Sequence, residues 1–96
     1  MIYLDYQATT PLAPEARDAM MRWLDGPGGT GFGNPHSPHR MGRQAKAAVE
    51  MARDQVAALF PAGGKVIFTS GATEAINLAI RGSGTQGTVS VSAIEH

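Results

Sequence analysis

The chain has 96 residues, of which 43% are hydrophobic and 17% are charged, and its eight Lys and Arg residues balance eight Asp and Glu residues. This balance excludes a polybasic nucleic-acid-binding arm and an acidic tail. The absence of cysteine excludes a disulfide framework, a thiolate zinc site and a cysteine nucleophile within these residues. Apolar runs are only a few residues long, whereas a membrane-spanning helix needs roughly 20. The first residues also lack the pattern of a signal peptide, so we expect a cytoplasmic protein that binds neither membranes nor nucleic acid.

The first third of the chain predicts a short strand, a turn and a helix. Residues 2–6 alternate apolar and polar side chains and predict a strand that ends in a turn at residues 7–11. Pro14 suits the first position of a helix, and the Gly26-Pro27 pair ends that helix. A stripe at helical spacing is expected to be buried; it comprises Ala16, Ala19, Met20, Trp23 and Leu24.

A glycine-rich loop then leads into a long helix. Residues 26–36 contain five glycines, which indicates a loop that is either mobile or shaped around something. Ser37 is the expected N-cap of the following helix and Pro38 its first residue, with residues 61–64 as the terminator. The predicted apolar face of this helix consists of Met41, Ala45, Ala48, Val49, Ala52, Val56, Leu59 and Phe60.

The last third predicts an α/β fold. A short apolar strand at residues 66–69 is followed by a turn at residues 70–74, a helix that ends at residues 81–84 and a second strand at residues 88–92. In open α/β sheets the ligand crevice lies just beyond the strand ends. The chain stops there, at residues 93–96, so we expect it to be a fragment of a longer protein.

The turn formed by Ser70, Gly71, Ala72 and Thr73 is the strongest local signal for a ligand. It opens a helix after a buried-type strand, so free backbone N–H groups and the helix dipole favour a phosphate there. An ordinary strand-to-helix turn with Ser70 as a cap explains the same residues equally well. The turn matches neither the P-loop nor the dinucleotide-binding fingerprint.

His36 and His39 have a spacing that occurs in zinc sites. No third ligand accompanies them in the sequence, so we predict no metal site and assign both histidines to the solvated or capping residues of a helix start.

Four segments together resemble the N-terminal portion of the cysteine desulfurases, which are class V, fold type I enzymes dependent on pyridoxal 5'-phosphate. They are YLDYQATTP at residues 3–11, GNPHSPHRMG at residues 33–42, FTSGATEAINLAI at residues 68–80 and EH at residues 95–96. The segments occur in the family's order and spacing and extend over essentially the whole chain. The resemblance implies that residues 1–15 belong to a small domain and residues 16–96 to the start of the large cofactor-binding domain, with the remainder absent.

The resemblance also assigns residues to the cofactor site. Ala72 and Thr73 match the positions that hold the cofactor phosphate, and His96 matches the catalytic histidine that stacks on the pyridine ring and moves protons. Ala8, Thr9 and the Asn34 loop match segments that border the substrate pocket. The Schiff-base lysine, the aspartate paired with the pyridine nitrogen, the persulfide-forming cysteine and the substrate-binding arginine have no counterpart in these residues.

The expected activity is therefore conversion of L-cysteine to L-alanine, with sulfur delivered as an enzyme persulfide for iron–sulfur cluster or thio-cofactor assembly. A homodimer and a sulfur-acceptor or scaffold protein are implied as partners, and the 96 residues alone are expected to be inactive. The alternatives are a selenocysteine lyase or another class V aminotransferase, a small module that binds a phosphorylated ligand, and an inactive truncated product.

Overall fold

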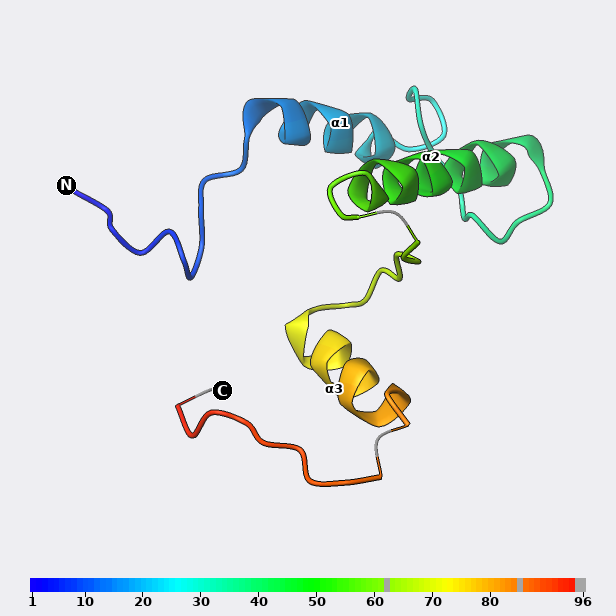
Figure 1. Ribbon diagram of the computed structural model, residues 1–96. Helices are drawn as coiled ribbons and strands as arrows, with labels where there is room; N and C mark the ends of the chain where they lie inside the picture. Colours follow the sequence, from blue (N-terminus) through cyan, green and yellow to red (C-terminus); the bar gives the residue numbers. More distant parts are fainter. Residues whose placement is uncertain (62, 85, 95–96) are drawn as a thin grey trace. The chain divides into compact units, whose positions relative to one another are not determined.

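The computed structural model describes residues 1–61, 63–84 and 86–94, and within them the chain forms three α-helices and no β-strand (Figure 1). The helices are α1 (Pro14–Leu24), α2 (Arg40–Ala57) and α3 (Ala72–Gly82). The chain divides into two compact units, Met1–Gly64 and Lys65–His96.

Helix α1 begins as the sequence predicts, with Pro14 in its first turn after Ala13 and with Glu15 at its positive end. The prediction of a buried stripe is wrong. None of the residues of α1 is buried; Trp23 is half-buried, and Leu24 keeps 68% of its surface exposed. Within the described residues α1 makes no close backbone contact with another helix, and the glycine-rich loop covers only the part of it around Trp23.

Helix α2 is confirmed, but its predicted N-cap is wrong. The helix begins at Arg40, and His39 caps it because its Nδ1 accepts a hydrogen bond from the Gly42 N–H at 3.2 Å. Ser37 instead belongs to the preceding turn, where its N–H donates to the Asn34 carbonyl oxygen at 2.9 Å. The Arg43 guanidinium donates to the Pro38 carbonyl oxygen and fastens this turn to the helix.

The apolar face of α2 is confirmed for most of its length. Ala45 is the one buried apolar residue of the described part of the chain, with 4% of its surface exposed. Half-buried residues continue the face on both sides of it: Met41, Ala48, Val49, Ala52 and Val56. Leu59 and Phe60 were expected to extend the face, but both lie beyond the helix end and are exposed.

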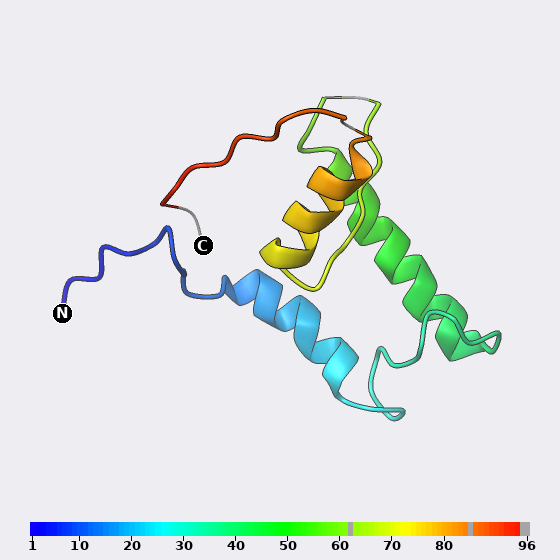
Figure 2. The same ribbon diagram turned by 90° about the horizontal axis from the view of Figure 1, so that it is seen from below.

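Helices α1 and α2 run in opposite directions and are joined by the glycine-rich loop (Figures 1 and 2). The loop makes close contact with both. A Cβ on Gly31 would come within 2.8 Å of Trp23 Cδ2, and a Cβ on Gly33, whose φ is +142°, would come within 2.6 Å of the Met41 carbonyl oxygen. These two glycines let the backbone approach closely, and this contact explains their presence better than mobility does.

None of the three predicted strands is formed within the described residues. Residues 2–6, 66–69 and 88–92 are irregular, so the α/β sheet is not confirmed. A strand requires a neighbouring strand to pair its N–H and C=O groups, and none of these segments has one here.

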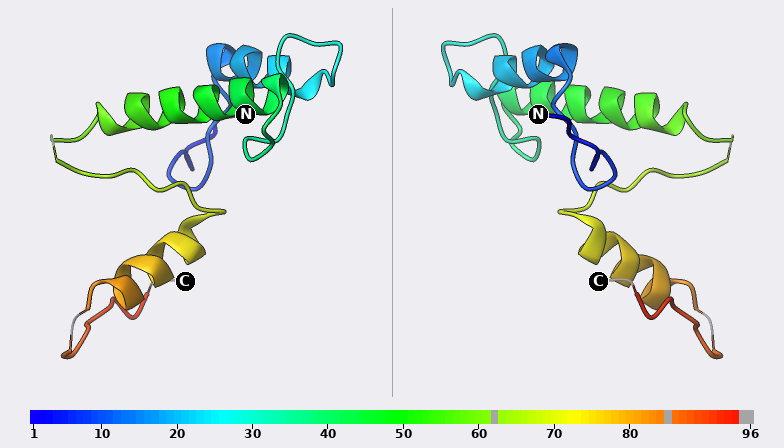
Figure 3. Two further views of the ribbon diagram at one scale, coloured as in Figure 1. Left: turned by 90° about the vertical axis from the view of Figure 1, so that its right-hand side faces the viewer. Right: turned by 90° about the vertical axis from the view of Figure 1, so that its left-hand side faces the viewer.

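Helix α3 forms the regular part of the second unit and is preceded by the irregular 64–70 segment (Figure 3). It begins at Ala72, inside the stretch expected to be a turn, and all its residues are exposed. Within the described residues, no helix is long and apolar enough to cross a lipid bilayer.

Candidate functional site

The start of α3 is shaped by short-range hydrogen bonds. The Thr69 hydroxyl donates to the Gly71 carbonyl oxygen at 3.0 Å, and the same oxygen accepts the Ala75 N–H at 3.1 Å, which is the first helical bond. The Asn77 side-chain amide donates to the Thr73 carbonyl oxygen at 2.8 Å. Gly71 is the N-cap residue in an extended conformation, and no side chain caps the helix.

Ser70 and Glu74 are bound to each other across this turn. One carboxylate oxygen of Glu74 accepts the Ser70 hydroxyl at 2.6 Å and the Ser70 N–H at 2.8 Å. These two bonds, the hydroxyl first and the backbone N–H second, hold the pKa of the Glu74 carboxyl below its ordinary value, because both stabilise the ionised form. Ser70 is therefore not the helix cap that the ordinary-turn interpretation assumed.

The N–H groups of Ala72 and Thr73 remain free of acceptors in the described part of the chain, as they precede the first helical bond. The Thr73 hydroxyl also has no partner among the described residues. A Cβ built on Gly71 would meet nothing within 4 Å, so there is open space against the backbone. Backbone N–H groups, a hydroxyl and the positive end of a helix dipole suit a phosphate dianion. The donor set thus fits the phosphate of the implied cofactor.

The two predicted phosphate-binding residues, Ala72 and Thr73, are thus brought together at one helix end. His96, predicted as a catalytic and cofactor-binding residue, lies outside the described residues, as does Glu95 beside it.

The segments expected to border the substrate pocket are both compact turns of the first unit. The Tyr3 hydroxyl contacts the carbonyl oxygens of Asp5 at 2.8 Å and Thr9 at 3.1 Å, and the N–H groups of Ala8 and Thr9 both donate to the Asp5 carbonyl. Asn34 accepts the His36 N–H through its side-chain oxygen at 2.9 Å. Because these segments belong to a different unit from α3, their relation to the turn at residues 70–73 stays a prediction.

No group of three or more metal-ligating side chains occurs among the described residues. His39 serves α2 as its cap, which is one of the two roles that the sequence suggested. His36 is exposed.

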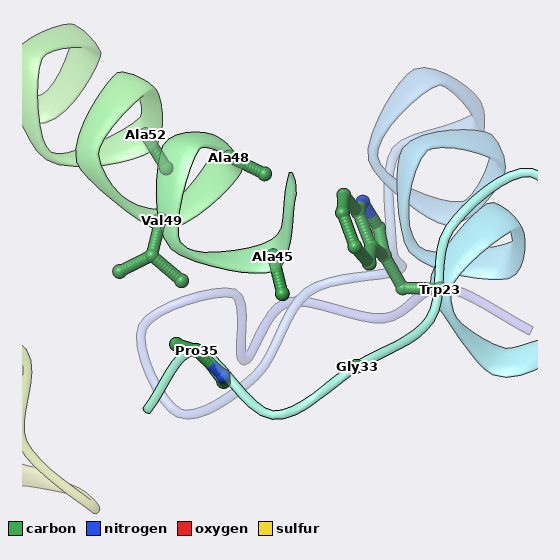
Figure 4. A pocket seen from close by; sticks show the side chains of 7 residues that line it. All are labelled: Trp23, Gly33, Pro35, Ala45, Ala48, Val49 and Ala52. Carbon is green, nitrogen blue, oxygen red and sulfur yellow. The ribbon is translucent and has the colours of Figure 1, made fainter. Parts of the chain in front are cut away.

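A groove of about 310 Å³ lies between Trp23, the Gly33–Pro35 loop and α2. Figure 4 shows the Trp23 ring facing the side of α2 that carries Ala45 and Ala48, with Pro35 on the loop below them. No ionisable side chain lines this groove of the first unit.

Sequence reasoning missed the pairing of Ser70 with Glu74. A glutamate three residues after an N-cap is the second half of a capping box, in which its side chain returns to the start of the turn. That signal was present in the sequence, although here the glutamate reaches one residue beyond the N-cap.

The comparison with protein families gives a match to the class V aminotransferases over residues 2–96. The chain therefore belongs to the class V aminotransferase family. Two curated relatives share 55% identity with it: Cysteine desulfurase IscS of Rickettsia akari (strain Hartford), and the mitosomal cysteine desulfurase of Encephalitozoon cuniculi (strain GB-M1). Each match covers 84% of this chain but only 19% and 18% of the respective relative. The chain thus spans about a fifth of the length of these relatives, and no solved structure matches it significantly.

Proposed function

We propose that this chain is the N-terminal part of a pyridoxal-phosphate-dependent cysteine desulfurase. The proposed reaction converts L-cysteine to L-alanine and delivers the sulfur as an enzyme persulfide, for iron–sulfur cluster or thio-cofactor assembly. The observation that carries the proposal is the free Ala72 and Thr73 N–H pair at the start of α3, within a chain that the family matches almost throughout.

In this proposal each site residue has a distinct task. Ala72 and Thr73 hold the cofactor phosphate with their N–H groups, and Thr73 adds its hydroxyl. His96 stacks on the pyridine ring and moves protons during substrate activation. Ala8, Thr9 and the Asn34 loop border the substrate pocket. When bound, the cofactor supplies an electron sink for the reaction at the substrate carbon, and the protein supplies position and bases.

The remaining features of the proposal follow from the same family membership. Residues 1–15 belong to the small domain and residues 16–96 begin the large α/β domain, in whose sheet residues 66–69 and 88–92 become strands. The lysine, aspartate, cysteine and arginine of the family site come from other residues than these, so the 96 residues alone are inactive. The whole protein is a cytoplasmic homodimer that hands sulfur to an acceptor or scaffold protein.

A second candidate is a selenocysteine lyase or another class V aminotransferase, since the same phosphate-binding turn serves any of them. The experiment is to express the full-length gene product, load it with pyridoxal 5'-phosphate, and measure alanine formed from L-cysteine and from L-selenocysteine. Alanine from L-cysteine, with sulfur retained on the protein as a persulfide, supports the desulfurase. Turnover of L-selenocysteine alone would contradict the desulfurase and support a selenocysteine lyase. A protein that binds no pyridoxal 5'-phosphate would contradict both enzymes and support a small module that binds another phosphorylated ligand.

A further inference from the structure

A serine just before a helix can accept hydrogen bonds from the free N–H groups at the helix start, and a glutamate in the first turn can do the same. The start of α3 has both, in Ser70 and Glu74. If either one capped the helix, it would occupy N–H groups that the phosphate needs.

In this structure neither of them caps α3. The Ser70 hydroxyl and the Ser70 N–H both donate to one carboxylate oxygen of Glu74, at 2.6 and 2.8 Å, and the helix has no side-chain cap. Hydrogen bonds to an ionised acceptor are stronger than those to a neutral one, so the carboxylate holds the serine in preference to a backbone carbonyl or water. The bond also holds the negative charge of Glu74 at Ser70, the residue that precedes the N-cap.

We propose that Ser70 and Glu74 keep each other occupied, and that this pair leaves the N–H groups of Ala72 and Thr73 free for the cofactor phosphate. Glu74 is thus a positioning residue that acts through Ser70 and does not itself touch the cofactor. This inference rests on the proposed function. It assigns a role to two residues for which the sequence resemblance implied none.

The test uses the full-length gene product and two probes, pyridoxal 5'-phosphate and pyridoxal, which differ only in the phosphate. Glu74→Ala frees Ser70 to cap the helix, and Ser70→Ala frees Glu74 to do so. We expect each variant to bind pyridoxal 5'-phosphate about tenfold more weakly than the wild type, the size of a lost cap or charge-assisted hydrogen bond. Binding of pyridoxal should stay unchanged, so the ratio of the two affinities falls.

Three further variants sharpen the result. The double variant Ser70→Ala/Glu74→Ala removes both competitors and should lose no more affinity than either single variant, since coupled residues are not additive. Glu74→Gln still accepts hydrogen bonds from Ser70 and should recover most of the binding. Glu15→Ala is the matched control, because Glu15 is also an acid in the first turn of a helix, but the residue before α1 is Ala13, which offers it no hydroxyl.

The outcomes are separable. If the wild type binds pyridoxal 5'-phosphate no better than pyridoxal, both the proposed function and this inference fail. If the wild type prefers the phosphorylated probe and Glu74→Ala has the same affinity ratio, the inference alone fails. Equal weakening of both probes would assign Glu74 a purely structural role and would also overturn it. Thermal melting of every variant identifies any loss of folding. If a single variant does not fold, the affinity ratios of the folded Glu74→Gln and double variants decide whether the inference holds.

Discussion

At the scale of single residues, the pKa of Glu74 reports on the hydrogen bonds of the turn at residues 69–74. Its two hydrogen bonds from Ser70 favour the ionised carboxyl, so the pKa lies lower in the folded protein than in the unfolded chain. The stabilisation is therefore complete above the unfolded pKa and is lost as the pH falls through the folded pKa. At neutral pH the Glu74 carboxyl is ionised and accepts both hydrogen bonds from Ser70.

We expect Ser70→Ala to raise the pKa of Glu74, because the Ser70 hydroxyl is the larger of the two causes of the shift; the backbone N–H groups that the carboxylate still reaches keep the pKa below its ordinary value. An NMR titration of the Glu74 side-chain carboxyl measures this directly. Thr69→Val is the control, since the Thr69 hydroxyl contacts the Gly71 carbonyl oxygen and not Glu74. An unchanged pKa in Ser70→Ala would show that the two side chains are not bonded in solution.

His39 provides a second prediction at this scale. His39→Ala removes the acceptor for the Gly42 N–H and should lower the free energy of unfolding of the full-length gene product by about 1 kcal/mol, the typical value of an N-cap. His39→Asn should restore most of it. His36→Ala is the control, because the contact of His36 with Asn34 uses its backbone N–H and survives the change. Urea denaturation measures all three, and equal stability of the His39→Ala and His36→Ala variants would contradict the cap.

At the scale of secondary structure elements, the packing of α1 on the glycine-rich loop depends on one close approach. Gly31→Ala would place a methyl group within 2.8 Å of the Trp23 ring, and such overpacking costs about 1–3 kcal/mol. We therefore expect a lower melting temperature in the full-length gene product. Gly28→Ala, in the same loop, meets nothing within 4 Å and should leave the melting temperature unchanged. A Gly31→Ala protein as stable as Gly28→Ala would mean that Trp23 does not rest on this backbone.

The helices could be predicted from the sequence because their signals are local. Pro14 marks the start of α1, and the apolar spacing of residues 41–56 marks the face of α2. The strands could not be verified in the same way, since a strand at residues 66–69 depends on partners that the described residues do not include. The cap of α2 was assigned to Ser37 because serine is a common cap, whereas the helix begins only at Arg40, and His39 directly before it provides the cap.

The candidate site was predictable to a similar degree. The turn at residues 70–73 indicated a possible phosphate site, the family resemblance selected Ala72 and Thr73, and the structure gives both of them free N–H groups. The sequence alone left Ser70 as an equally plausible cap. Only the position of the Glu74 carboxylate in the structure distinguishes the two interpretations. Which partner the Ser70 side chain binds depends on three-dimensional geometry, and the spacing of residues in the sequence does not determine it.

At the scale of the whole molecule, the chain covers very little apolar surface. Among the described residues Ala45 alone is a buried apolar residue, and Ile67, Phe68 and Ile76 each keep about half of their surface or more exposed. Burial of apolar area is the main driving force for folding, so a chain with so little burial cannot offset its conformational entropy.

We accordingly expect the 96 residues, expressed alone, to lack a cooperative unfolding transition and to be digested rapidly by proteases. Differential scanning calorimetry and limited proteolysis test this. The full-length gene product serves as the control and should melt cooperatively. A protease-resistant monomer of the 96-residue chain that melts in a single transition would contradict the prediction.

The local character of the α3 turn has a consequence for biosynthesis. Every hydrogen bond described at residues 69–77 joins groups no more than four positions apart in the chain. Helical turns form in about a microsecond or less, whereas a ribosome adds about 5–20 residues per second. The nascent chain can therefore sample the turn at the start of α3 as soon as these nine residues leave the exit tunnel.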